Sequence, residues 1–228
     1  MQNFKTIYQR AAKRKGGEDK LQAMLPQLTP KVKLAKLQDS YCLCLMSKCI
    51  FRSGFVWRVV ENKWQEISQA FHNFEPDELN KLGDEQWYAY ANDPRIIRNM
   101  TKVFAIRDNL ALIQEYSAEH QGFARFIAQW PEDDLVGLFI HLKKNFKRLG
   151  GMTGQYFLAF LGKDSFILTK DVVLCLQEAG VNVADMPGSQ RDLRLVQEAF
   201  NTWHKETKLP YRHLSAIMAL SVGVNYLE

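Results

Sequence analysis

The sequence predicts an all-α protein of roughly ten helices joined by short loops. Its long apolar stripes recur at spacings of three and four residues, which is the period of a helix with one buried face. Residues that commonly start helices precede most of these stripes. Only one short apolar stretch, Ser165–Thr169, indicates a strand. With 228 residues, 46% of them hydrophobic, the chain can bury a sizeable core as one large domain or two small ones.

The first strongly apolar segment begins at Asp39 and Ser40, either of which can cap a helix. This helix is apolar on nearly every side, which predicts a central, buried element. Gly54 interrupts it, and a second helix then carries Trp57 and Val60 on its apolar face. The sequence therefore predicts two consecutive helices separated by a glycine turn.

Later helices are predicted from their starting residues. The starts are Glu75–Asp77, Asp84, Asn99, Pro131–Asp134 and Ser189. The clearest amphipathic stripe follows Asn99, with Val103 and Ile106 as its first apolar residues. The last helix is predicted to run from about Tyr211 to Val222.

Positive charge is concentrated near the N-terminus. The formal net charge is +5, but residues 1–36 carry +7, which leaves −2 for the rest. We therefore separate a basic N-terminal segment, residues 1–36, from a single helical unit, residues 37–228, with two helical lobes as the alternative arrangement of that unit. The basic segment lacks the apolar core of a secretory signal, and basic residues interrupt the longest apolar stretches. We expect a cytoplasmic protein that does not associate with a membrane.

The four cysteines show neither the spacing of a zinc motif nor a histidine nearby. They are Cys42, Cys44, Cys49 and Cys175. Cysteines of this kind are typically small buried hydrophobes in a reducing compartment. We therefore expect no disulfide, no structural zinc or other metal, and no cofactor.

Residues 141–156 combine a basic helix end with a glycine turn. The helix ends in four basic residues, Gly150 and Gly151 form the turn, and Thr153 begins a new helix. Such a turn directs backbone N–H groups outward and can bind an anion. The neighbouring cations make a nucleic-acid backbone the expected anion. The alternative is a solvated basic face next to a simple helix stop.

Four motifs appear in order between Phe51 and Asn109. They are Ser53-Gly54-Phe55-Val56-Trp57, Phe71-His72-Asn73-Phe74-Glu75-Pro76, Pro94–Asn99 with Lys102, and Arg107-Asp108-Asn109. In these motifs the chain resembles the DNA-3-methyladenine glycosylase I family, which belongs to the helix-hairpin-helix DNA glycosylase superfamily. Residues 146–162 resemble the hairpin of the same family. The resemblance implies an all-α, helix-hairpin-helix glycosylase-like fold.

The same resemblance implies an enzyme of base excision repair. The family flips an alkylated purine such as 3-methyladenine out of double-stranded DNA and hydrolyses its N-glycosidic bond. Flipping requires unstacking, which is easiest for a damaged base. By this likeness we expect a monomeric, monofunctional DNA glycosylase without lyase activity.

Trp57 matches the pocket tryptophan of the family, whose electron-rich face attracts a cationic base. Its alternative role is to pack two helices together in the core. Beside it we place Cys49, Phe51 and Tyr41 in the base pocket. Gly54 and Phe55 match the turn that approaches DNA, where an apolar side chain can wedge between bases. The full set of expected DNA-binding residues is Arg52, Gly54, Phe55, Lys143, Lys147, Arg148, Gly150, Gly151 and Thr153.

The sequence also departs from the family, as a divergent branch. Cys49 stands where the family has a base-recognising glutamate, and the four zinc ligands have no counterparts. The catalytic aspartate of the superfamily falls on Thr169, so Asp171 is the one catalytic candidate, with a helix-start role as its alternative. Two other functions therefore remain open: a catalytically altered or inactive lesion-binding relative, and a helical protein-interaction module with a basic tail.

Overall fold

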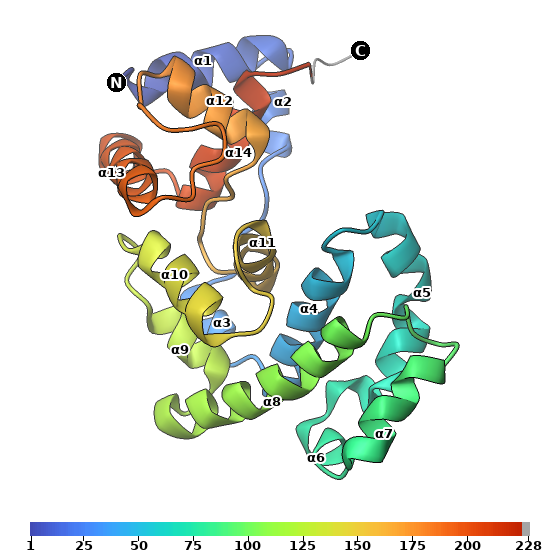
Figure 1. Cartoon of the computed structure of the whole chain (residues 1–228). Helices are drawn as coiled ribbons and strands as arrows, with labels where there is room; N and C mark the ends of the chain where they lie inside the picture. Colours follow the sequence, from blue (N-terminus) through green and yellow to red (C-terminus); the bar gives the residue numbers. More distant parts are fainter. Residues whose placement is uncertain (225–228) are drawn as a thin grey trace. The chain divides into compact units, whose positions relative to one another are not determined.

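The computed structural model describes residues 1–224 (Figure 1). Within that range it contains fourteen α-helices, two short 3-10 helices and no strand. The predicted all-α fold class is therefore confirmed. The α-helices outnumber the roughly ten predicted; two of those that no predicted start marks, α2 and α3, are only six and four residues long, too short to show an apolar stripe. None of the described helices is both long enough and apolar enough to span a bilayer.

The chain forms two compact units, and the first gathers three separate stretches of sequence. These are Met1–Thr29, Pro131–Phe139 and the described residues from Asp164 onward. Its helices are α1 (Phe4–Arg14), α2 (Glu18–Ala23), the beginning of α10 (Leu135–Asn145), α12 (Lys170–Glu178), α13 (Gln190–Thr207) and α14 (Tyr211–Ser221). Helix α1 packs along α14.

The core of this first unit is aromatic. The rings of Phe4 and Trp203, both fully buried, lie 5.7 Å apart, and Phe166 stacks on Phe200 at 4.2 Å. The basic N-terminal segment takes part in this packing, because Arg10 forms a 2.9 Å ion pair with Glu178. Residues 4–14 are therefore a docked helix in this unit.

The second unit comprises Pro30–Trp130 and Ile140–Lys163. Its elements are α3 (Lys31–Leu34), α4 (Asp39–Arg52), α5 (Trp57–Ala70), η1 (His72–Phe74), α6 (Pro76–Leu79), α7 (Asp84–Ala89), η2 (Tyr90–Asn92), α8 (Met100–His120), α9 (Phe123–Gln129), the end of α10, and α11 (Met152–Leu161). Helix α4 contacts α5, α8, α9 and α11, and buries Leu43, Met46 and Ile50 completely. The prediction of a central, buried helix there is confirmed.

Several predicted helix boundaries are confirmed. Asn99 caps α8, its side chain accepting a 3.2 Å hydrogen bond from the amide of Lys102. Ser189 caps α13 in the same way, accepting from the amide of Asp192 at 3.0 Å. The last helix ends at Ser221, one residue before its predicted end.

Two predicted helix starts are displaced. Helix α4 begins at Asp39 itself, with Gln38 as the N-cap residue, while the Asp39 carboxylate accepts from the amide of Phe123 at 3.4 Å. Helix α10 begins after the acidic run, and Asp134 accepts a 3.1 Å hydrogen bond from the amide of Gly137. The Asp39 carboxylate thus serves an amide outside its own helix, whereas Asp134 sits directly before α10 and bonds the amide three residues on, as a capping residue does.

The predicted strand at residues 165–169 was wrong. Ser165 to Leu168 are buried in an extended segment, but no second strand pairs with them among the described residues. The segment leads into α12, which Thr169 caps by accepting a 3.3 Å hydrogen bond from the amide of Val172. Burial against helices, and not a sheet, accounts for its apolar side chains.

All four cysteines are unpaired thiols, and three of them are buried. Across residues 1–224, no group of three or more histidine, cysteine, aspartate or glutamate side chains is placed to hold a metal ion.

Candidate functional site

A short turn joins α4 to α5. Helix α4 stops at Arg52, and Gly54 has a φ of +76°, in the left-handed region. A residue with a Cβ is disfavoured there by about 1–2 kcal/mol, although the surroundings of Gly54 leave open space. The turn leaves Phe55 and Trp57 exposed, at 38% and 40% of their surface. Glycine thus allows a chain reversal that presents two aromatic side chains to solvent.

Lys102 of α8 holds this turn in place. The residue is only 2% exposed, and its ammonium donates to the carbonyl oxygens of Phe51 at 3.0 Å and Ser53 at 2.6 Å. It also lies 4.3 Å from the centre of the Phe55 ring. Burial, together with the positive charge of Arg148, lowers the pKa of Lys102 to about 8. The last carbonyls of a helix lack backbone partners, and here a buried side chain supplies them.

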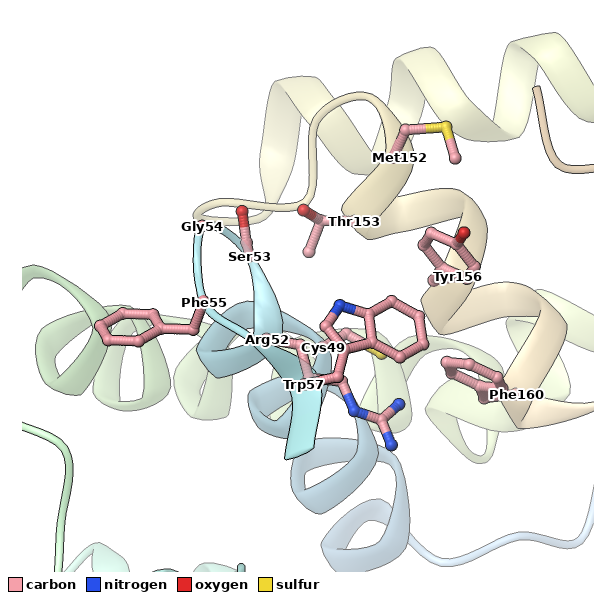
Figure 2. Close-up of a pocket in the computed structure, with 10 residues that line it drawn as sticks. All are labelled: Cys49, Arg52, Ser53, Gly54, Phe55, Trp57, Met152, Thr153, Tyr156 and Phe160. Atoms are coloured by element: carbon pink, nitrogen blue, oxygen red, sulfur yellow. The ribbon is translucent and has the colours of Figure 1, made fainter. Parts of the chain in front are cut away.

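A cavity of about 280 Å³ lies between this turn and α11 (Figure 2). It is lined by Cys49, Arg52, Ser53, Gly54, Phe55, Trp57, Met152, Thr153, Tyr156 and Phe160. All of these residues belong to the second compact unit. The cavity is smaller than the ~300–1,000 Å³ typical of pockets for drug-sized ligands, which suits an occupant the size of one nucleobase.

Three aromatic rings form the walls of this pocket. The Trp57 ring meets Tyr156 edge-on at 5.0 Å and Phe160 at 6.1 Å, and the last two stack on each other at 5.7 Å. Figure 2 shows the indole between the turn and α11, with Tyr156 and Phe160 beside it. The partial exposure of Trp57 argues against the alternative that it only packs two helices in the core.

A positively charged side chain of the protein already packs against the aromatic walls of the pocket. The guanidinium of Arg52 lies 4.7 Å from the centre of the Trp57 ring and 5.1 Å from that of Phe160. Its Nε donates to Glu61 at 2.8 Å, and a second guanidinium nitrogen contacts the same carboxylate. Lys48 forms a further ion pair with Glu61 at 2.7 Å. Burial alone would raise the pKa of Glu61, but the hydrogen bonds from Lys48 and Arg52 hold it below its usual value.

Cys49, predicted from the sequence to belong to the base pocket, lies in the pocket wall. Burial raises the pKa of its thiol to about 12. The thiol is therefore neutral at physiological pH and cannot replace a carboxylate. No acidic side chain stands among the lining residues.

The second turn joins α10 to α11 and lies beside the pocket. Arg148 and Gly151 both have positive φ, +62° and +57°. Gly154, in the first turn of α11, faces the carbonyl oxygen of Leu149, and a Cβ on Gly154 would collide with that oxygen. The hairpin therefore packs against α11 at a distance that only glycine permits.

Asn109 of α8 fastens this hairpin. The side chain is fully buried, donates to the carbonyl oxygen of Lys147 at 3.0 Å and accepts from its amide at 2.7 Å. Four cations surround the turn with exposed side chains: Lys143, Lys144, Lys147 and Arg148. None of the four takes part in a salt bridge with another described residue. Their charge is available to an external anion.

The structure brings together most of the residues selected from the sequence. Those that line the pocket are Cys49, Arg52, Gly54, Phe55, Trp57 and Thr153, and those in or next to the hairpin are Lys143, Lys147, Arg148, Gly150 and Gly151. Two residues placed in the pocket do not line it. Phe51 is fully buried and packs against Trp64 at 6.5 Å, and Tyr41 lies in the first turn of α4, 49% exposed.

Asp171, the one catalytic candidate, lies in the first compact unit and not in the unit that holds the pocket. It occupies the first turn of α12, just after the capping residue Thr169. This position fits the helix-start role that was its alternative.

Five residues of the site were missed in the sequence or noted only as part of a motif. They are Lys102, Asn109, Gly154, Tyr156 and Phe160. A signal existed for the last two, because Tyr156 and Phe160 are four residues apart on α11 and therefore lie on one face. For Lys102 and Asn109 the signal was a polar residue within the apolar stripe of α8.

The second unit is thus all-α, with an aromatic pocket beside a glycine turn and a basic hairpin. The comparisons with known proteins name the family. The methyladenine glycosylase family model matches residues 37–143, a little under half of the chain. This segment, which holds α4 to α9, is therefore similar to the methyladenine glycosylases, and the resemblance read from the sequence is confirmed.

Among solved structures, a variant of 3-methyladenine DNA glycosylase I from Staphylococcus aureus is similar at 19% sequence identity. The likeness covers 55% of this chain and 77% of that one, with a TM-score of 0.49. No curated protein sequence matches the chain.

Proposed function

We propose that the chain is a DNA glycosylase of base excision repair, which flips an alkylated purine from double-stranded DNA and hydrolyses its N-glycosidic bond. The observation that carries the proposal is the pocket of Trp57, Tyr156 and Phe160, open beside the Gly54 turn. The part of it that α4 and α5 supply lies within the segment that matches the methyladenine glycosylases. Aromatic faces bind any flipped base by stacking, and an unpaired, damaged base is the easiest to flip.

The two turns have separate tasks in this proposal. Phe55, exposed next to a glycine that permits close approach, enters the gap that the flipped base leaves. The hairpin amides and the exposed cations Lys143, Lys147 and Arg148 bind the phosphates of the DNA backbone. Phosphate contacts set the position of the duplex, and the pocket selects the base.

The lining of the pocket bears on the chemistry. Hydrolysis breaks the bond between C1′ and the base nitrogen, with the electron pair leaving on the base and a water oxygen bonding to C1′. The lining includes no lysine that could form a Schiff base and no carboxylate that could activate the water. We therefore expect a monofunctional enzyme without lyase activity, whose rate depends on stabilising the departing base.

The test is release of free base from DNA duplexes that each carry one methylated purine: 3-methyladenine, 7-methylguanine or 1-methylguanine. Trp57→Ala is expected to lower kcat/KM by about 10- to 100-fold, since stacking on an aromatic side chain contributes ~1–3 kcal/mol per base. Tyr88→Ala, which removes another exposed aromatic of the same unit, serves as the matched control. If none of the three bases is released, the proposal fails.

A second function is favoured by Cys49 and by the guanidinium that covers Trp57. In that case the chain is a lesion-binding relative that recognises damage without excision. Tight, specific binding to a duplex with an abasic analogue, with no base released from any of the three lesions, would support it.

A further inference from the structure

The pocket contains a fixed positive charge that a binding site for cationic bases would not need. The side chain of Arg52 is 14% exposed and lies against Trp57 and Phe160 while it is paired with Glu61. Lys48 shares the same carboxylate. The cluster therefore holds two cations and one anion, a net charge of +1, and the other lining residues add no acid.

A base that arrives with a positive charge meets this cluster unfavourably. The electron-rich face of Trp57, which would attract such a base, is already engaged by the guanidinium at 4.7 Å. Like charges at short range inside a partly desolvated pocket repel each other. The neutral Cys49 thiol offers no compensating negative charge.

The same wall is rich in hydrogen-bond donors. Arg52 directs its Nε and one terminal nitrogen to Glu61, which leaves Nη1 with two N–H groups that have no acceptor among the described residues. The hydroxyl groups of Thr153 and Tyr156 also line the pocket without a hydrogen-bond partner in residues 1–224. A guanidinium matches two adjacent acceptors in one plane, as the O6 and N7 atoms of a guanine-type base provide.

We propose that the pocket selects uncharged, oxo-bearing alkylated purines, with Arg52 as the residue that determines this specificity. The proposal rests on the glycosylase function proposed above and names its substrate class. When the C1′–N9 bond breaks, its electron pair moves onto the base, and the guanidinium stabilises that charge through hydrogen bonds to O6 and N7. A water oxygen bonds to C1′ and loses a proton to solvent, and the released base takes up a proton from solvent.

The test compares two methylated guanines that differ only in the position of the methyl group. In DNA, 1-methylguanine is uncharged and keeps both O6 and N7 as acceptors, whereas 7-methylguanine is cationic and has N7 blocked. We expect the wild-type protein to release 1-methylguanine with a kcat/KM at least about tenfold above that for 7-methylguanine, after subtraction of spontaneous loss. Arg52→Met should lower release of 1-methylguanine by at least about tenfold and not lower that of 7-methylguanine.

Arg52→Lys is the matched variant, because it can keep the ion pair with Glu61 but loses the planar pair of donors. It should fold as the wild type does, by thermal melting, and still lose most of the preference for 1-methylguanine. A wild-type protein that prefers 7-methylguanine, or a preference that survives both substitutions, would overturn the proposal.

Binding of free nucleosides separates this proposal from the glycosylase function. The probes are 1-methylguanosine and 7-methylguanosine, titrated against tryptophan fluorescence with Trp57→Phe as the blank. Preferential binding of 1-methylguanosine that Arg52→Met abolishes, without release from any DNA, supports the selectivity and contradicts the glycosylase function. Release of both bases at equal rates would support the glycosylase function and overturn the proposed preference for uncharged bases. Absence of both binding and release overturns both.

Discussion

The two turns beside the pocket reverse the chain in the same way but expose different kinds of side chain. Each reverses the chain at a helix end with a residue in the left-handed region, Gly54 in one and Gly151 in the other. Each is held by a buried polar side chain of α8, Lys102 for the first and Asn109 for the second. These two residues are seven positions apart, which places them two turns apart on one face of the helix. Helix α8 therefore sets the spacing between the turns.

The surfaces that the two turns expose differ in kind. The α4–α5 turn presents Phe55 and Trp57, and the hairpin presents Lys147 and Arg148. Apolar contact can distinguish one base from another, whereas neutralised phosphate supplies affinity without sequence information. Under the proposed function, the unit would separate base recognition from DNA affinity, so that substitutions alter one without the other.

The largest effect is expected from removal of the ammonium that holds the α4–α5 turn. Lys102→Met keeps the length of the side chain but leaves the carbonyl oxygens of Phe51 and Ser53 without their donor. We expect the free energy of unfolding to fall by about 3 kcal/mol, since hydrogen bonds to charged groups contribute ~1.5–3 kcal/mol each. Urea denaturation measures this change, and base release should fall with it.

Lys63→Met is the matched control, because Lys63 also donates to a backbone carbonyl, that of Pro94, at 2.6 Å, but on the surface. Its free energy of unfolding should change by less than ~1 kcal/mol. Equal losses in the two variants would show that burial of Lys102 contributes nothing.

A smaller effect is expected at the hairpin. Asn109→Ala removes both hydrogen bonds to the backbone of Lys147, and the exposed groups of the hairpin can then turn to water. We expect destabilisation of about 2 kcal/mol, weaker DNA binding, and faster hydrogen exchange at the Lys147 amide. Asn99→Ala, which removes the cap of the same helix, should cost about 1 kcal/mol without loosening the hairpin. If the Lys147 amide exchanged hydrogen at the wild-type rate in Asn109→Ala, Asn109 would not be what holds the hairpin in place.

The smallest effect is expected from a single surface charge. Lys147→Gln should weaken binding to every DNA sequence alike and reduce the slope of log K against log salt by about 0.9, the value for one phosphate contact. Lys13→Gln removes an exposed charge from the basic N-terminal segment and serves as the control. A larger change in slope for Lys13→Gln than for Lys147→Gln would show that the first compact unit, and not the hairpin, makes the phosphate contacts.

Local signals in the sequence were enough to predict much of the fold. The glycine break at Gly54, the caps at Asn99 and Ser189 and the helical apolar stripes each act within a few residues, so they can be read without tertiary structure. The apolar stretch from Ser165 to Thr169 was wrongly predicted as a strand, because the burial of its side chains comes from helices distant in sequence, as in the contacts of Phe166 with Phe139 and Phe200.

The pocket was only half predictable for the same reason. Trp57 begins α5 within a sequence motif, and Cys49 lies on α4 eight residues before it, but Tyr156 and Phe160 reach the pocket from α11 more than ninety positions later. The contact of Arg52 with Trp57 needs both helices in place. Asp171 was selected by counting along the chain, and counting does not show that residues 164–224 join a different compact unit.

The packing of α1 along α14 has a consequence for how the chain is made. The indole of Trp203 donates a 3.0 Å hydrogen bond to the carbonyl oxygen of Gln2, a contact between residues 201 positions apart. On the ribosome, the second compact unit is complete once Lys163 has been made, whereas the first needs residues from both ends of the described chain. Helix α1 contacts α2 and α13, but its most extensive packing is along α14, which is synthesised about two hundred positions later. We therefore expect α1 to be among the last of the described helices to dock fully.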